Sequence, residues 1–140
     1  MELYRGRLID HLQLVVRDLA QSRRFYEAVL GTLGVPIAGD GPGFFYADEL
    51  VVSDVKSPAS AGALTGRAHL AFQAPDSETV ERAYRAGLEA GGKDNGAPGM
   101  REQYHPGYYA AFLLDPDGNN VEVVFHGTAK RSAVSIKIEF

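Results

Sequence analysis

Two histidines and one glutamate stand where they can act together on a metal ion. His11 and His69 each open an apolar stretch, "HLQLVV" and "HLAFQA", and Glu122 interrupts a third, "NVEVVF". A charge inside an apolar strand must either face water or have a partner. Two imidazoles and one carboxylate form a facial site for a divalent metal such as Fe, Mn, Ni, Co or Zn, with positions left open for a substrate.

An internal repeat relates the segments that must position these side chains. "HLQLVVRDLAQSRRFYEAVLGTLG" (11–34) aligns without gaps with "HLAFQAPDSETVERAYRAGLEAGG" (69–92), 58 residues later, and eight of 24 positions are identical. Each copy predicts a strand (9–16 and 67–74), an aspartate that caps a helix, and glycines that end this helix. Three shorter strands follow, at 35–38, 43–46 and 50–54 in the first copy, and at 93–97, 108–114 and 121–126 in the second. The sequence therefore predicts an α+β fold of two tandem βαβββ modules.

Alternation along the predicted strands decides which way the candidate ligands point. Successive strand side chains point to opposite faces, so His11 and Gln13 share one face, as do His69 and Gln73. Glu122 lies on the corresponding face of the last strand, opposite to its apolar neighbours. All these faces are turned away from the predicted helices. If the two modules curl their sheets around a common cleft, the three candidate ligands converge on it.

A second polar cluster precedes the penultimate strand, in "MREQYHPGYYAAFLLDPDG" (100–118). His105, Tyr104 or Tyr109 can move a proton, since imidazole titrates near neutral pH. Arg101 can hold a substrate carboxylate. A packed aromatic lid is the alternative interpretation of this loop. Further candidates for contact with a substrate are Tyr108, Gln13 and Gln73.

Simpler structural roles account for other polar residues. Asp18 and Asp76 are predicted helix caps, and Tyr26 and Tyr84 are predicted to face the core. The Asp and Asn residues of "DPDGNN" (115–120) are most simply turn formers, because such side chains mimic backbone turns. The turn also sets the register that points Glu122 away from the helix, since a one-residue slip would reverse its direction.

The sequence resembles the vicinal oxygen chelate superfamily, which includes glyoxalase I, extradiol dioxygenases, fosfomycin-resistance proteins and bleomycin-binding proteins. The segments "IDHLQLVVRDLAQSRRFYEAVLG", "GRAHLAFQAPD" and "LLDPDGNNVEVV" carry the resemblance, which covers residues 8–126. It implies one glyoxalase-like domain, of modules 8–56 and 67–126, that forms a curved sheet around a cleft. It also implies metal ligands at His11, His69 and Glu122. Glyoxalase I-like members supply a further carboxylate, for which Glu49 and Asp54 are the nearest candidates, and neither is in clear register.

Three classes of function are considered, of which the resemblance implies the first two. One is a metal-dependent enzyme, glyoxalase (lactoylglutathione lyase)-like or extradiol dioxygenase-like, whose small substrate chelates the metal through neighbouring oxygens. Another is a metal-free protein that binds a small molecule or drug, in the manner of bleomycin-resistance proteins. A third is a scaffold that assembles through its C-terminal strand. The resemblance also implies a homodimer.

Composition narrows the setting further. The net charge of −4 gives no basic surface for nucleic acid, and the absence of cysteine excludes disulfides and thiolate metal sites. No apolar run is long enough to span a bilayer, and the N-terminus lacks the features of a signal peptide. A cytoplasmic protein that acts on a small molecule is therefore expected. Within the extension 127–140, Val134, Ile136, Ile138 and Phe140 alternate with polar residues, which predicts a strand packed on the domain or across a dimer interface.

Overall fold

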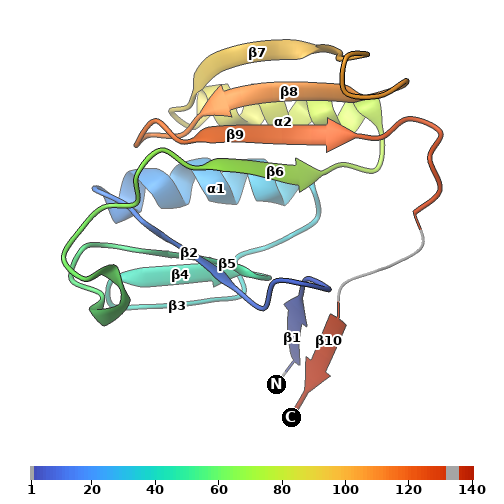
Figure 1. The fold of residues 1–140 in the computed structure, drawn as a ribbon. Helices are drawn as coiled ribbons and strands as arrows, with labels where there is room; N and C mark the ends of the chain where they lie inside the picture. Colours follow the sequence, from blue (N-terminus) through green and yellow to red (C-terminus); the bar gives the residue numbers. More distant parts are fainter. Residues whose placement is uncertain (1, 132–135) are drawn as a thin grey trace.

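The computed structural model describes residues 2–131 and 136–140, and it contains two modules of the same design (Figure 1). The first module comprises β2 (Leu12–Val15), α1 (Leu19–Thr32), β3 (Gly39–Gly41), β4 (Phe44–Ala47) and β5 (Leu50–Ser53). The second comprises β6 (His69–Gln73), α2 (Ser77–Glu89), β7 (Lys93–Met100), β8 (Tyr109–Leu114) and β9 (Asn120–Phe125). A short 3₁₀ helix, η1 (Pro58–Ser60), lies in the segment between them. The predicted α+β class and the tandem βαβββ modules are confirmed.

The two sheets have the same topology, so the sequence repeat is also a structural repeat. Their strand orders are β2-β5-β4-β3 and β6-β9-β8-β7. In each sheet the first strand of the module pairs in parallel with the last, and the other pairs are antiparallel. The prediction of a strand at 35–38 is wrong, because β3 begins only at Gly39. Pro36 has no N–H to donate to a ladder, and the hydrogen bonds to β4 start with Ala38 N, which donates to the Tyr46 carbonyl at 2.9 Å.

Local signals position both helices as the sequence predicted. The Asp18 carboxylate accepts a hydrogen bond from Gln21 N at 3.1 Å, and the Asp76 carboxylate accepts one from Thr79 N at 2.7 Å. The apolar pattern of α2 predicts that Val80, Tyr84 and Leu88 share the buried face, but Leu88 is 36% exposed and Tyr84 is only partly buried. The buried residues of α2 are instead Thr79, Val80, Ala83 and Gly87. These residues are short, and this lets the helix approach its neighbours closely.

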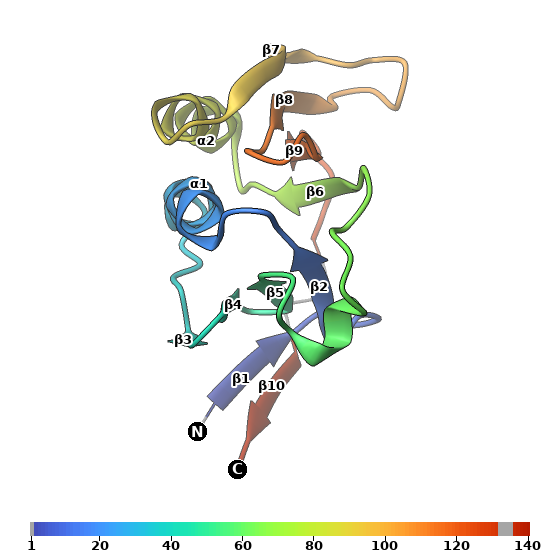
Figure 2. The same ribbon diagram turned by 90° about the vertical axis from the view of Figure 1, so that its left-hand side faces the viewer.

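The two helices contact each other and share one core (Figure 2). Gly87 lies at this contact, where an added Cβ would come within 2.4 Å of Leu113 Cδ1 and 3.1 Å of Val29 Cγ2. Only glycine therefore lets α2 pack at this distance from α1 and β8. Because the helices lie together, each sheet packs one face on its own helix and turns the other face away from the shared core.

The turn before β9 also joins the two modules. Asp115 is buried, and its carboxylate accepts hydrogen bonds from Tyr26 of α1 at 2.6 Å and from the Asn119 backbone at 2.8 Å. The Asp117 carboxylate accepts another from Arg17 N at 2.9 Å. Burial and the Asp115 carboxylate both raise the pKa of Tyr26. The turn-forming role predicted for this segment is confirmed, and its side chains have a second role in docking the first module.

A two-stranded terminal ribbon lies beside the modules. It pairs β1 (Glu2–Arg5), which the sequence did not predict, with β10 (Ile136–Glu139) in antiparallel orientation, and it brings the two ends of the chain together (Figures 1 and 2). The predicted tail strand therefore exists and packs on β1, although Val134 lies outside the described residues. Within residues 2–131 and 136–140, no helix is long and apolar enough to cross a membrane.

Candidate functional site

His69 and Glu122 meet on the face of the second sheet that is turned away from α2. The two strands that carry them, β6 and β9, are parallel neighbours. His69 Nε2 and Glu122 Oε1 are 3.1 Å apart, and the glutamate side chain is only 4% exposed whereas the imidazole is half exposed. Tyr108 donates its hydroxyl hydrogen to the other carboxylate oxygen, Oε2. Burial and the Glu122 carboxylate raise the pKa of Tyr108.

Both nitrogens of His69 face oxygen atoms that accept. Nδ1 lies 3.1 Å from the Asn120 carbonyl, which can only accept, so Nδ1 carries a hydrogen. A neutral imidazole then has a lone pair at Nε2, where it faces the carboxylate of Glu122. Either a second proton or a cation must lie between these two atoms. The donor set of an imidazole nitrogen and a carboxylate oxygen fits a divalent metal ion at this point.

Phe112 links His69 to Arg101 on the same face. Its ring stacks on the His69 imidazole, with centroids 6.3 Å apart and planes at 20°. The Arg101 guanidinium lies 5.4 Å from the Phe112 centroid and donates to the Ala97 carbonyl at 2.8 Å. Sequence reasoning missed Phe112. In the structure Phe112 pairs directly with Glu122 across β8 and β9, so it shares the face of Glu122.

The aromatic residues near the start of β8 and the end of β9 separate into two groups. His105 Nε2 lies 2.8 Å from His126 Nδ1, and both imidazole rings pack edge-on against Tyr108, at 5.1 and 5.5 Å. Tyr104 packs on Tyr108 as well, with ring centroids 4.9 Å apart, and is otherwise exposed. Tyr109 points to the opposite face, where its hydroxyl donates to a carboxylate of α2, Glu81 Oε1, at 2.7 Å. The structure therefore groups Tyr104 and His105 near Glu122 and leaves Tyr109 on the helix side.

His11 lies apart from the other two candidate ligands. It precedes β2 by one residue, its side chain is 58% exposed, and its Nδ1 lies 2.7 Å from Asp10 Oδ1. The hydrogen bond with His11 lowers the pKa of Asp10. In the described part of the chain, no three His, Cys, Asp or Glu side chains are close enough together to hold a metal ion. The structure thus joins His69 to Glu122 and does not bring His11, Glu49 or Asp54 to them within one chain.

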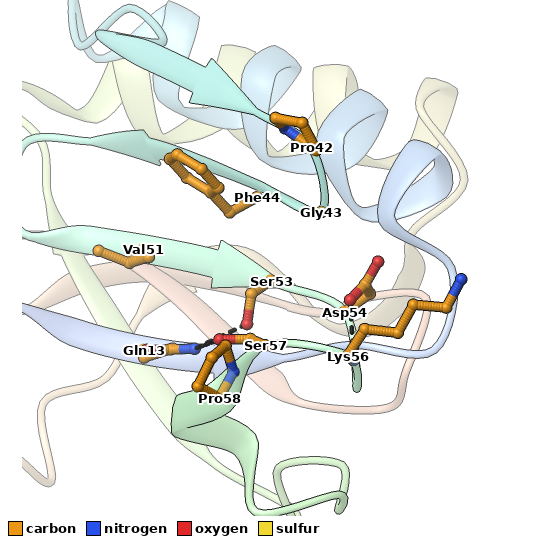
Figure 3. A pocket seen from close by; sticks show the side chains of 10 residues that line it. All are labelled: Gln13, Pro42, Gly43, Phe44, Val51, Ser53, Asp54, Lys56, Ser57 and Pro58. Atoms are coloured by element: carbon orange, nitrogen blue, oxygen red, sulfur yellow. Dashed lines mark hydrogen bonds between the residues drawn. The ribbon is translucent and has the colours of Figure 1, made fainter.

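The first sheet carries a hollow on its helix-free face (Figure 3). Its volume is about 610 Å³. Gln13 lies in it and donates through Nε2 to the hydroxyl oxygens of Ser53 and Ser57, at 2.7 and 3.1 Å. The other predicted glutamine, Gln73, is exposed at the end of β6 in the second module. The hollow is lined by Gln13, Pro42, Gly43, Phe44, Val51, Ser53, Asp54, Lys56, Ser57 and Pro58.

Comparisons with known proteins agree with this architecture. The profile of the glyoxalase/bleomycin resistance protein/dioxygenase superfamily matches residues 8–123. A glyoxalase/bleomycin resistance protein from Albidiferax ferrireducens T118 is 30% identical with a TM-score of 0.69, over 84% of this chain and 98% of that chain. A putative glyoxalase from Bacillus halodurans is 25% identical with a TM-score of 0.62, over 84% and 95%.

A more distant structure shares the fold alone. Lactoylglutathione lyase from Agrobacterium tumefaciens is 21% identical with a TM-score of 0.61, over 85% of this chain and 93% of that chain. No curated protein sequence matches the chain.

Proposed function

Since the chain belongs to the glyoxalase/bleomycin resistance protein/dioxygenase superfamily, we propose that it is a metal-dependent enzyme of the glyoxalase or dioxygenase type. Its substrate is a small molecule that binds a divalent metal through two neighbouring oxygens. The observation that carries this proposal is the pair formed by His69 Nε2 and Glu122 Oε1, an imidazole and a buried carboxylate 3.1 Å apart on a rigid sheet. A cation between these atoms satisfies both acceptors.

The third ligand in this proposal is His11 of a second copy of the chain. The packing of α1 on α2 supports this, because it turns the helix-free faces of the two sheets away from the shared core. The first sheet of one copy can then cover the second sheet of the other, and a twofold axis creates two equivalent sites. The homodimer is thus part of the proposed function, with residues 8–126 as its single domain. A cytoplasmic location stays a prediction.

The protein's own side chains have distinct tasks in this site. The metal, when bound, acts as a Lewis acid that stabilises negative charge on a substrate oxygen. Tyr108 donates its hydroxyl hydrogen to Glu122 Oε2, beside the proposed metal position. Arg101, whose guanidinium lies over the Phe112 ring, can bind a substrate carboxylate. The His105–His126 pair packs against Tyr108 and can take up or release a proton near it.

A second candidate function is metal-free binding of a small molecule. It is favoured by the contacts of Glu122, whose two oxygens both have partners, in His69 and Tyr108, without any ion. A protonated His69 would neutralise the carboxylate and leave the hollow of the first module as the binding site. Gln13 and Phe44 would then be contact residues.

Metal content separates the two candidates. Protein purified without chelator is analysed for Fe, Mn, Ni, Co and Zn, beside the variants His69→Ala and Glu122→Gln. We expect about one metal per chain in the unchanged protein and a loss of at least tenfold in either variant, since each removes one of three ligands. Gln73→Ala, on the same face, is the control and retains the metal. A metal-free unchanged protein that binds small molecules would favour the second candidate.

The reaction type is tested next. The metal-loaded protein is assayed with an adduct of an α-ketoaldehyde and a thiol, for isomerisation, and with a catechol, for ring cleavage by O₂. Activity toward one of them that disappears in Glu122→Gln supports the enzyme proposal.

A further inference from the structure

We propose that the hollow on the first sheet binds an aromatic carboxylate, with its ring on Phe44 and Val51 and its carboxylate toward Lys56. This deepens the proposed function, because it names the class of molecule that the site shared between two copies of the chain would bind. It rests on the proposed function for the role of this molecule as substrate, whereas binding in the hollow itself requires no metal.

The hollow has an apolar part that suits a flat ring. Phe44 and Val51 lie on the helix-free face, and Pro42 and Pro58 line the walls (Figure 3). Phe44 is 37% exposed, so its ring is available to a ligand. An apolar ring gains by leaving water for such a surface, and an aromatic ring gains further by offset or edge contact with phenylalanine. A volume of about 610 Å³ is large enough for a small aromatic molecule.

The floor of the hollow supplies hydrogen-bond donors. Gln13 Nε2 donates to the hydroxyl oxygens of both Ser53 and Ser57, so each hydroxyl keeps its own hydrogen. Among the described residues neither hydroxyl donates to another group, and only Ser57 is partly exposed, since Ser53 is 1% exposed. A ligand that offers an acceptor oxygen can therefore satisfy the Ser57 hydroxyl.

One end of the hollow carries the ammonium group of Lys56. The Lys56 ammonium forms no ion pair with the carboxylates that the structure describes, whereas its backbone N–H donates to Asp54 Oδ1 at 2.9 Å. Figure 3 shows Asp54 and Lys56 at the same end of the hollow. The Asp54 charge reduces the attraction for anions, and this selects a singly charged carboxylate over a phosphate.

The location connects this hollow to the proposed metal site. His11 precedes Gln13 by two residues and stands one position before β2, beside the strand that carries Gln13. A ring held on Phe44 and Val51 therefore lies on the face that the proposed dimer closes over His69 and Glu122 of the second copy.

Two probes with the same ring test the proposal in chelator-treated protein. Benzoate and benzyl alcohol are titrated, and backbone amide shifts are followed by NMR. We expect saturable shifts in β4, β5 and residues 53–57, and an affinity for benzoate at least about threefold above that for benzyl alcohol. Lys56→Met should abolish this preference, and Asp54→Asn should strengthen it. Lys93→Met, which removes an exposed charge from the second module, is the matched control and should leave the preference unchanged.

Three results would overturn the proposal. These are equal affinity for the two probes, a preference that persists in Lys56→Met, and shifts confined to the second module. Because the metal has been removed, a failure here is independent of the metal content that tests the proposed function. Conversely, failure of the metal test does not decide this proposal, since a metal-free protein can still prefer benzoate.

Discussion

At Glu122 both carboxylate oxygens have partners, and those partners come from different elements. His69 of β6 contacts Oε1, and Tyr108, just before β8, contacts Oε2. Strand alternation was sufficient to predict the face of Glu122, because its neighbours Val121 and Val123 must enter the core. The position of Phe112 required the pairing of β8 with β9. This register depends on the turn between the two strands, and single-strand periodicity does not contain it.

Tyr26 and Tyr84 occupy the same place in the two repeats but make different bonds. Tyr26 donates to the buried Asp115, whereas Tyr84 donates to the exposed Asp94 at 2.8 Å. Tyr26→Phe should lower the free energy of unfolding by about 1–3 kcal/mol, because a buried carboxylate loses a donor. Tyr84→Phe is the matched control and should change it little, since water replaces the lost partner. Urea denaturation of both variants gives the values, and equal effects would contradict a docking role for Tyr26.

The same bond should make stability depend on pH. Burial and Asp115 raise the pKa of Tyr26 above its ordinary value of 10.0. The unfolded chain therefore loses this proton at lower pH than the folded chain, so the contribution is complete below pH 10 and decreases as pH rises further. Unfolding followed between pH 8 and 11 should show a decrease in stability above pH 10 that is smaller in Tyr26→Phe. If stability decreases equally in both proteins, the decrease comes from other titrating groups and not from Tyr26.

At the scale of elements, the packing of α1 on α2 decides which faces remain free. The sequence predicted both helices, their caps and the buried Tyr26, because these depend on residues a few positions apart. It did not predict that α2 turns its short residues, Ala83 and Gly87, toward its neighbours. The hydrophobic pattern favoured Leu88 instead, since periodicity records apolar character and not closeness of approach. Of the terminal ribbon only the C-terminal strand was predicted, because β1 is too short to show a clear period of apolar residues.

Gly87 offers a direct test of this helix contact. Gly87→Ala places a methyl group within 2.4 Å of Leu113 Cδ1, so we expect a loss of about 1–3 kcal/mol in unfolding free energy. Gly31 of α1 has no atoms within 4 Å of an added Cβ. Gly31→Ala should therefore stabilise the protein, by up to about 1 kcal/mol, because alanine is the better helix former. Chemical denaturation checks both variants, and a stabilised Gly87→Ala would refute the close contact.

At the scale of the whole molecule, the two modules of one chain share a core and do not bring the candidate ligands together. His69 and Glu122 belong to the second module, and His11 belongs to the first, exposed and bonded to Asp10. The sequence predicted the sheet face on which His69 and Glu122 lie, but it placed His11 inside a strand that begins only at Leu12. It could not show how the modules face each other, because either packing satisfies the same alternation. In the proposed homodimer the first sheet of one copy covers the second sheet of the other, and this brings the three candidate ligands together.

Subunit mixing tests this central claim most directly. His11→Ala and Glu122→Ala chains are purified separately, unfolded and refolded together in equal amounts, and their metal content is measured. Each variant alone should bind no metal at the site. In a mixed dimer one of the two sites would receive all three unchanged ligands, so the mixture should recover about one quarter of the metal bound by the unchanged protein. A mixture that binds no more than its components, when the unchanged protein refolded in the same way binds metal, would contradict a site shared between copies.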